Sequence, residues 1–183
     1  MMDITSFKEV SEVAVKKFAD SPLGKMSEGR FFDKPMSEYD KPFEEGFATR
    51  NEGLEGKKHP ETGVEYERKT VKDDKGDPVE GVFPKFDSVY DVQLPEDLHQ
   101  ASDKEQFNEC NNQLKEAVEK DPDLAEKFTP EQLEQIKNGD TPDGYTWHHN
   151  EETGKMQLVD SETHAKSGHT GGKVIWGGGQ ENR

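Results

Sequence analysis

Four of the six histidines of this chain lie within 22 positions of one another, in the segment from residue 144 to residue 172. A polar, glycine-containing turn inside this segment predicts a β-hairpin with strands at 144–149 and 155–159. A short helix is predicted to follow over 162–166, capped by Asp160 or Ser161. This unit of two strands and one helix gathers the histidines in a small volume, and it constrains the fold more than any other feature of the sequence.

These histidines suit a metal site with a catalytic base beside it. Neutral imidazole is the commonest protein ligand for zinc and related ions, so His148, His164 and His169 are the candidate ligands. Neighbours on a strand point to opposite faces, so His149 is left to activate a water molecule. The unperturbed pKa of histidine, about 6.5, suits it to take a proton near neutral pH. His164 and His169 would lie about 140° apart on a regular helix. We therefore expect Gly168 to take a left-handed conformation that ends the helix and returns His169 to the ion.

The composition limits how much of the chain can be well packed. Hydrophobic residues make up 28% and charged residues 35%, with a mean hydropathy of -1.12. We expect residues 1–58 to form an arm or linker, partly irregular, with one short helix at 4–18. The single cysteine, Cys110, excludes an internal disulfide, and it lies on an apolar stripe typical of a core. No run approaches 18 apolar residues, so no membrane segment is predicted.

Between the arm and the histidine segment the sequence predicts further regular elements. Residues 59–86 read as a second β-hairpin around the turn DDKGD, and 86–95 as a short extended run. Two amphipathic helices follow, the first starting at a capping box and the second at a Thr-Pro pair. The fold class is therefore α+β. The helices run from Ser102–Glu105 to a stop at Asp121–Pro122, and from Thr129–Pro130 to Asn138–Gly139.

The charge argues against nucleic acid at first sight, because the chain has a net charge of -16 and phosphate binding normally needs a basic surface. Most of the excess lies away from the histidines: residues 59–140 hold 22 acidic and 10 basic side chains, whereas 141–183 hold 6 and 4. A nucleic-acid site at the histidines is weakened but not excluded. A bound divalent cation would add positive charge there.

At the histidines the chain resembles the nuclease domain of the HNH/endonuclease VII superfamily. Within it, the segment is similar to the WHH-type nucleases at the C-termini of bacterial polymorphic toxins. The sequence from His59 through Pro95 also looks like the leader of these domains. The resemblance therefore spans about 59–183, with a motif core at 144–176. The matching stretches are GYTWHH at 144–149, GKMQLV at 154–159, His164, HTGG at 169–172 and Trp176.

The resemblance implies a C-terminal ββα-metal motif packed on a small helical scaffold with an N-terminal β-hairpin. One divalent ion, Zn, Mg, Mn or Ni, would lie beside the phosphodiester. Gln157 stands where many HNH members have an asparagine that braces the hairpin and orients the base. Three lysines are candidate phosphate contacts, with an ordinary solvated side chain as the alternative for each. The predicted site is His149 and Gln157 for catalysis, His148, His164 and His169 for the ion, and Lys155, Lys166 and Lys173 for substrate.

The predicted function is a metal-dependent endonuclease that hydrolyses nucleic acid, DNA in preference to RNA. The resemblance implies an antibacterial toxin with a cognate immunity protein. We expect it in the cytoplasm of the producing cell, or delivered into a target cell by a dedicated system, because the N-terminus lacks the apolar core of a signal peptide. Two alternatives stay open: a non-catalytic module in which the histidines hold a structural zinc, and an acidic antitoxin or nucleic-acid mimic.

Overall fold

The computed structural model describes residues 49–179, and the fold class is α+β, as predicted. The helix predicted at 4–18 and the arm up to residue 48 lie outside the described residues. None of the helices in 49–179 has the length and apolarity that crossing a bilayer requires. The elements are η2 (Glu52–Leu54), β1 (Glu65–Lys72), β2 (Pro78–Lys85), β3 (Ser88–Gln93), η3 (Glu96–Leu98), α3 (Asp103–Lys120), α4 (Pro122–Ala125), α5 (Pro130–Asn138), β4 (Tyr145–His149), β5 (Lys155–Asp160), α6 (Ser161–Lys166) and α7 (Gly172–Ile175).

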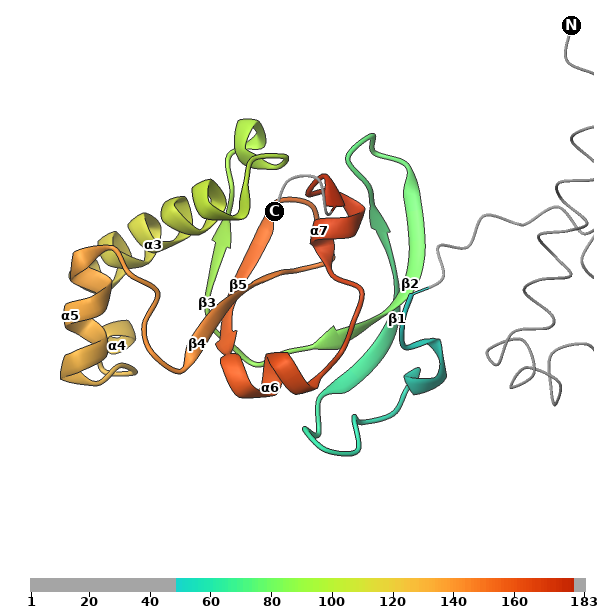
Figure 1. Cartoon of the computed structure of the whole chain (residues 1–183), viewed down its shortest axis with the longest axis horizontal. Helices are drawn as coiled ribbons and strands as arrows, with labels where there is room; N and C mark the ends of the chain where they lie inside the picture. The colour runs from blue at the N-terminus through green and yellow to red at the C-terminus, as the bar shows by residue number, and fades with distance from the viewer. Residues whose placement is uncertain (1–48, 180–183) are drawn as a thin grey trace, which may run out of the picture. The chain divides into compact units, whose positions relative to one another are not determined.

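The described strands form two antiparallel sheets (Figure 1). β1 and β2 pair over their whole length in a two-stranded ribbon, and the turn between them follows Asp73, whose N–H donates to the carbonyl of Asp77. The second sheet has the strand order β3-β5-β4. Both predicted hairpins are therefore confirmed. The extended run predicted after the first hairpin is β3, and it forms an edge of the sheet that carries the histidines.

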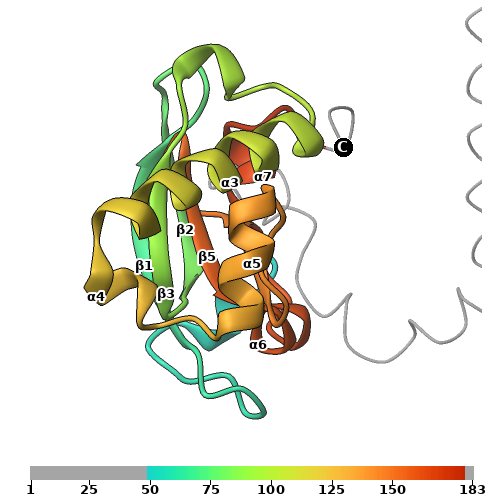
Figure 2. The ribbon, with the colours of Figure 1, turned by 90° about the vertical axis from the view of Figure 1, so that its left-hand side faces the viewer.

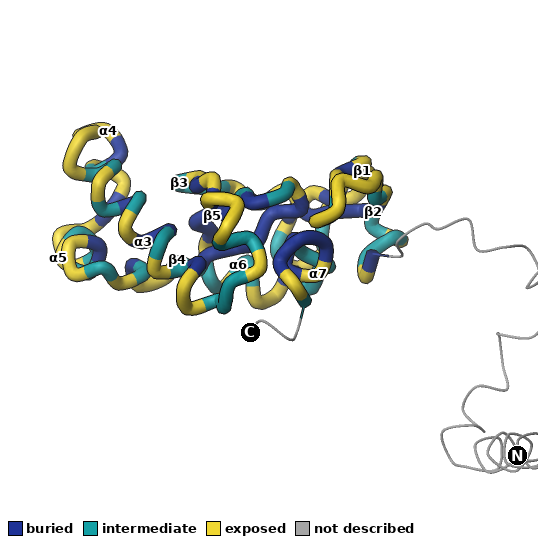
Figure 3. The backbone as a smooth tube through the Cα atoms, turned by 90° about the horizontal axis from the view of Figure 1, so that it is seen from above, coloured by how far each residue is buried: buried dark blue, intermediate teal, exposed yellow. Residues whose placement is uncertain are grey.

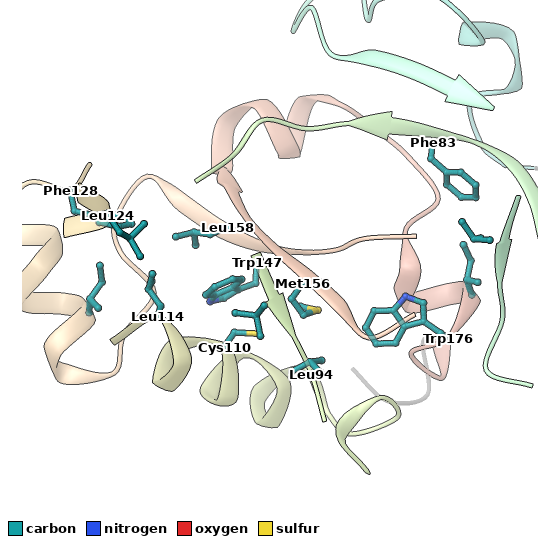
Figure 4. Packing of buried hydrophobic residues seen from close by; sticks show 14 residues of the cluster. Phe83, Leu94, Cys110, Leu114, Leu124, Phe128, Trp147, Met156, Leu158 and Trp176 are labelled. Atoms are coloured by element: carbon teal, nitrogen blue, oxygen red, sulfur yellow. The ribbon is translucent and has the colours of Figure 1, made fainter. Parts of the chain in front are cut away.

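The three-stranded sheet lies between helices α3 to α5 on one side and the β1–β2 ribbon on the other (Figures 1 and 3). Strand alternation sends Trp147 toward α3, where it joins Cys110 and Leu114 in the main core (Figure 4). Fully burying a side chain such as that of Leu114 contributes about 1.5–3 kcal/mol to the free energy of unfolding. Burial also raises the pKa of the Cys110 thiol to about 12, so this cysteine is a core residue, as predicted. A second core between sheet and ribbon consists of Val64, Tyr66, Val82, Phe86 and Val159.

Helices α3 and α5 begin and end where their capping residues predicted. The Ser102 hydroxyl accepts a hydrogen bond from the Glu105 N–H, and the Glu105 carboxylate accepts one from the Ser102 N–H. Thr129 caps α5 in the same way, and Gly139 ends it with a φ of 86°. Figure 2 shows α3 and α5 covering one face of the sheet. α3 turns its predicted apolar stripe toward this face, and Cys110 and Leu114 of the stripe are buried in the main core.

Helix α4 could not be predicted, because the Asp-Pro pair that stops one helix also starts the next. Asp121 is the C-cap of α3 and the N-cap of α4, and its carboxylate accepts hydrogen bonds from the N–H groups of Asp123 and Leu124. Proline at the first helical position costs no hydrogen bond. The extra turn buries Leu124 in the main core.

The prediction that Gly168 takes a left-handed conformation is wrong. The described glycines with positive φ do not include Gly168, and α6 ends at Lys166, followed by its C-cap Ser167 with φ -94° and ψ 77°. Ser167 is fully buried, and its hydroxyl lies 2.7 Å from that of Thr62. A tertiary contact, rather than a glycine turn, therefore redirects the chain toward His169.

Replacing Gly172 with alanine is expected to destabilise the domain by about 1–3 kcal/mol or slightly more. A Cβ at this position would overlap the carbonyl oxygen of Asn150 and Nε1 of Trp176, which are hydrogen-bonded to each other at 2.8 Å. Urea unfolding of the full chain measures the loss. Gly53→Ala is the matched control, because no atom lies within 4 Å of its added Cβ; equal stability of the two variants would contradict the packing argument.

Candidate active site

The structure brings the three predicted metal ligands together. His148 lies on β4, His164 on α6 and His169 in the loop after α6, and one ring nitrogen of each lies within 4.8 Å of the other two. The Asp160 carboxylate places α6 by accepting a hydrogen bond from the Thr163 N–H. Phe86 packs against all three rings, at centroid separations of 4.9, 5.4 and 5.3 Å. β4 and α6 thus place two of the three histidines, and one aromatic side chain packs on all three rings.

A divalent ion fits this group of histidines. Nε2 of His148 is buried without a hydrogen-bond partner, which is uncommon for a polar atom in a native protein and which a bound ion would explain. Nδ1 of His148 lies 3.3 Å from Nε2 of His164. Nδ1 of His169 lies 2.7 Å from the carbonyl oxygen of Ser167, so it donates there and Nε2 keeps the lone pair that a metal needs.

The surroundings keep these imidazoles neutral, which is the form that binds a metal. Burial lowers the pKa of His164 to about 4, and the nearby His169 adds to the effect. Burial likewise lowers the pKa of His169. The pKa of His148 lies well below its usual value, first because of burial and then because of His169 and His164. Protons therefore compete weakly with an ion at neutral pH.

His149 faces the opposite side of the sheet from His148, as strand alternation predicted. Its ring lies between Phe107 of α3 and Trp176, at centroid separations of 5.7 and 5.6 Å. Its Nε2 lies 2.8 Å from Oε1 of Gln106, also on α3. The adjacent histidines thus belong to two different environments, one among imidazoles and the other against a helix.

Gln106 fixes the tautomer of His149. The amide nitrogen of Gln106 donates to the carbonyls of Leu98 and His99, at 2.8 and 2.7 Å, so its Oε1 is turned toward the ring and can only accept. Nε2 of His149 therefore carries the hydrogen, and Nδ1 is the basic nitrogen. No local signal marks Gln106, because it lies 43 residues before His149.

Gln157 lies opposite His148 on β5 and braces the sheet. Its Oε1 accepts a hydrogen bond from Nδ2 of Asn150 at 2.9 Å, and its Nε2 donates to Oδ1 of Asp91 at 3.2 Å. Residues directly opposite on antiparallel strands share a face. Gln157 therefore supports the side of the sheet that carries the three grouped histidines, not the side of the His149 ring.

Each of the three lysines predicted to bind substrate lies beside a carboxylate. Lys173 is the most enclosed, at 5% exposure, and also donates to Oε1 of Gln106 at 3.2 Å. A phosphate would have to displace the carboxylates before it reached these ammonium groups. The pairs are Lys155–Glu152 at 3.2 Å, Lys166–Glu162 at 2.8 Å and Lys173–Asp103 at 2.8 Å.

Arg50 is a further cation at the site, and no motif in the sequence marks it. Its side chain is exposed, and no carboxylate within residues 49–179 pairs with it. Its backbone N–H donates to the Thr170 hydroxyl at 3.0 Å, and a Cβ on Gly168 would lie 3.4 Å from its guanidinium carbon. Arg50 therefore lies beside the loop that carries His169. It was missed because the composition of 1–58 is that of a linker.

A ββα unit with three imidazoles around one point, and a fourth histidine behind the same strand, is the kind of centre that metal-dependent hydrolases build. Residues 75–171, a little over half of the chain, match the family described as the DNase/tRNase domain of colicin-like bacteriocin. The chain belongs to this family, so it is a nuclease toxin domain with nucleic acid as its substrate. No curated protein and no solved structure matches the chain.

Proposed function

We propose that the chain is a metal-dependent endonuclease of the HNH type, in its WHH group, which hydrolyses DNA in preference to RNA. One observation carries the proposal: His148, His164 and His169 meet within 4.8 Å inside the region that matches the nuclease family. Three imidazoles leave coordination positions for water and substrate, whereas structural zinc sites are usually closed by four protein ligands. Zn, Mg, Mn and Ni are the candidate ions.

His149 is the proposed general base. Gln106 makes Nδ1 its basic nitrogen. Because His149 is the last residue of β4, this atom would take the proton from the attacking water at the end of the strand rather than on the face that carries the ligands. Gln157 keeps β4 and β5 in register beside the ligands. When bound, the ion supplies electrostatic stabilisation for the charge that develops on the phosphate and the departing oxygen.

Arg50 is the proposed phosphate contact, because it is exposed and unpaired within 49–179 and lies beside the His169 loop. The net charge of -16 opposes the approach of a polyanion, so we expect modest affinity that falls as salt is added. If Arg50→Ala binds DNA as tightly as wild type at the same ionic strength, Arg50 does not have this role.

The proposal includes a partner and a place of action. A nuclease toxin would also cut the DNA of the cell that makes it, so we propose a cognate immunity protein. The toxin would stay in the cytoplasm of the producing cell until a dedicated system delivers it. A protein encoded beside this chain that blocks plasmid cleavage in vitro would be that partner. A producing cell that tolerates the active chain without any inhibitor would contradict this part of the proposal.

Cleavage of supercoiled plasmid by the full chain is expected with at least one of Mg²⁺, Mn²⁺, Zn²⁺ and Ni²⁺, and to stop when a chelator is added. Gel electrophoresis follows the nicked and linear products, and transfer RNA in parallel reactions tests the substrate preference. Faster loss of transfer RNA would reverse the DNA preference. Intact plasmid and intact RNA under every ion would refute the nuclease proposal.

A further inference from the structure

His169 lies in a loop, residues 167–170, whose backbone makes few hydrogen bonds to other backbone groups. Among residues 49–179 the loop makes one backbone–backbone hydrogen bond, from the N–H of Ser167 to the carbonyl of Thr163 at 3.0 Å. Gly168 stands directly before His169, and glycine restricts the chain least. The position of the third ligand therefore depends on contacts from elsewhere in the fold.

Side chains from residues 51–66 supply these contacts. The Tyr66 hydroxyl donates to the carbonyl of Gly168 at 3.2 Å, and Nδ2 of Asn51 donates to the same carbonyl. Nδ2 of Asn51 also lies 3.3 Å from the Tyr66 hydroxyl. The Thr62 hydroxyl is hydrogen-bonded to the Ser167 hydroxyl at 2.7 Å. All three side chains come from outside residues 75–171, the region that matches the family.

We infer that Tyr66 and Asn51 are positioning residues of the metal centre: their shared bonds to the Gly168 carbonyl hold His169 where it meets the other two ligands. This inference rests on the proposed metal-dependent function. Groups that orient metal ligands raise metal affinity, and their loss typically costs about 10- to 100-fold. An ordered ligand also loses less conformational freedom when the ion binds.

The hydroxyl of Tyr66 is hydrogen-bonded to the loop, whereas its ring packs in the core. The side chain is 1% exposed, and its ring packs in the same core as Phe86, which contacts all three imidazoles. Tyr66→Phe therefore removes the bond to Gly168 without opening a cavity. It isolates the positioning effect from general stability.

Titration of the full chain with Co²⁺ tests the inference, because the visible spectrum of this ion reports its coordination. Tyr66→Phe and Asn51→Ala are each expected to raise the dissociation constant about 10- to 100-fold. The wild-type spectrum should return at high Co²⁺, since all three ligands remain. His169→Ala removes a ligand, so its spectrum should stay different at any concentration.

Tyr90→Phe is the matched control, because its hydroxyl also donates to a backbone carbonyl, that of Gln113 at 3.5 Å, on the α3 side of the sheet. It should bind Co²⁺ like wild type. If Tyr66→Phe and Asn51→Ala also bind like wild type, or if Tyr90→Phe weakens binding equally, the positioning role is refuted while the proposed function stands. A wild-type chain that binds no Co²⁺ would overturn the metal centre itself.

Discussion

His149→Ala is expected to lower the rate of plasmid cleavage about 10²- to 10⁴-fold, the usual contribution of a general base, while Co²⁺ binding stays close to that of wild type. The separation follows from strand alternation. His148 faces the group of three imidazoles, whereas the His149 ring packs against Phe107 and Trp176 on the other side of the sheet. Removing the ring therefore takes away the base without taking away a ligand.

Two measurements decide this prediction: single-turnover cleavage at saturating ion, and titration with Co²⁺ in the absence of DNA. His59→Asn is the control, because this histidine lies outside the ligand group and asparagine can still accept the hydrogen bonds of the turn at 59–62. Wild-type cleavage by His149→Ala would exclude it as the base. Loss of Co²⁺ binding in this variant would instead show that the two faces of β4 are not independent.

Local signals in the sequence predicted the elements that position the site. The caps at Ser102 and Thr129 and the two polar turns depend on residues a few positions apart, so they can be recognised without knowing the fold. The grouping of the three ligands could also be predicted, because the hairpin and the helix that carry them are consecutive in the chain. The division of His148 and His149 between two faces follows from the strand alone.

The supporting contacts could not be predicted, because they join residues far apart in the chain. Gln106 and His149 are 43 residues apart, and Tyr66 and Gly168 are 102 apart. Glutamine and tyrosine on an ordinary helix or strand give no sign of a role in such a contact. The Gly168 prediction failed for a related reason: a glycine permits a left-handed turn but does not require one, and here the buried Ser167 determines the path.

The net charge of -16 favours a bound cation but opposes a polyanionic substrate, so the charges around the ligand group matter for substrate binding. The ligand group itself contains imidazoles rather than carboxylates, and burial keeps these imidazoles neutral. The predicted phosphate-binding lysines are held by Glu152, Glu162 and Asp103. With these three lysines paired, the proposed ion and the proposed phosphate contact Arg50 are the candidate sources of positive charge beside the ligand group within residues 49–179. Cleavage should accordingly depend more steeply on the ion than on any one lysine.

His148→Ala is expected to abolish stabilisation of the chain by Zn²⁺, a loss of about 4 kcal/mol when the ion is at a thousandfold excess over its dissociation constant. Without the ion, the variant should be less stable than wild type by up to about 4 kcal/mol. Truncating a buried side chain to alanine costs about 2–5 kcal/mol of packing. It also removes the unpartnered Nε2, whose burial costs about 1–3 kcal/mol, so the two effects partly cancel.

Urea unfolding with Zn²⁺ and with a chelator measures both parts of this prediction, with His59→Asn again as the control that should keep the full effect of the ion. A Zn²⁺ shift of wild-type size in His148→Ala would show that the ion binds elsewhere.

The same proteins separate a catalytic from a structural ion. If wild type is stabilised by Zn²⁺ yet cleaves no nucleic acid with any ion, the histidines hold a structural zinc. Loss of cleavage and of stabilisation together in His148→Ala ties the chemistry to this group.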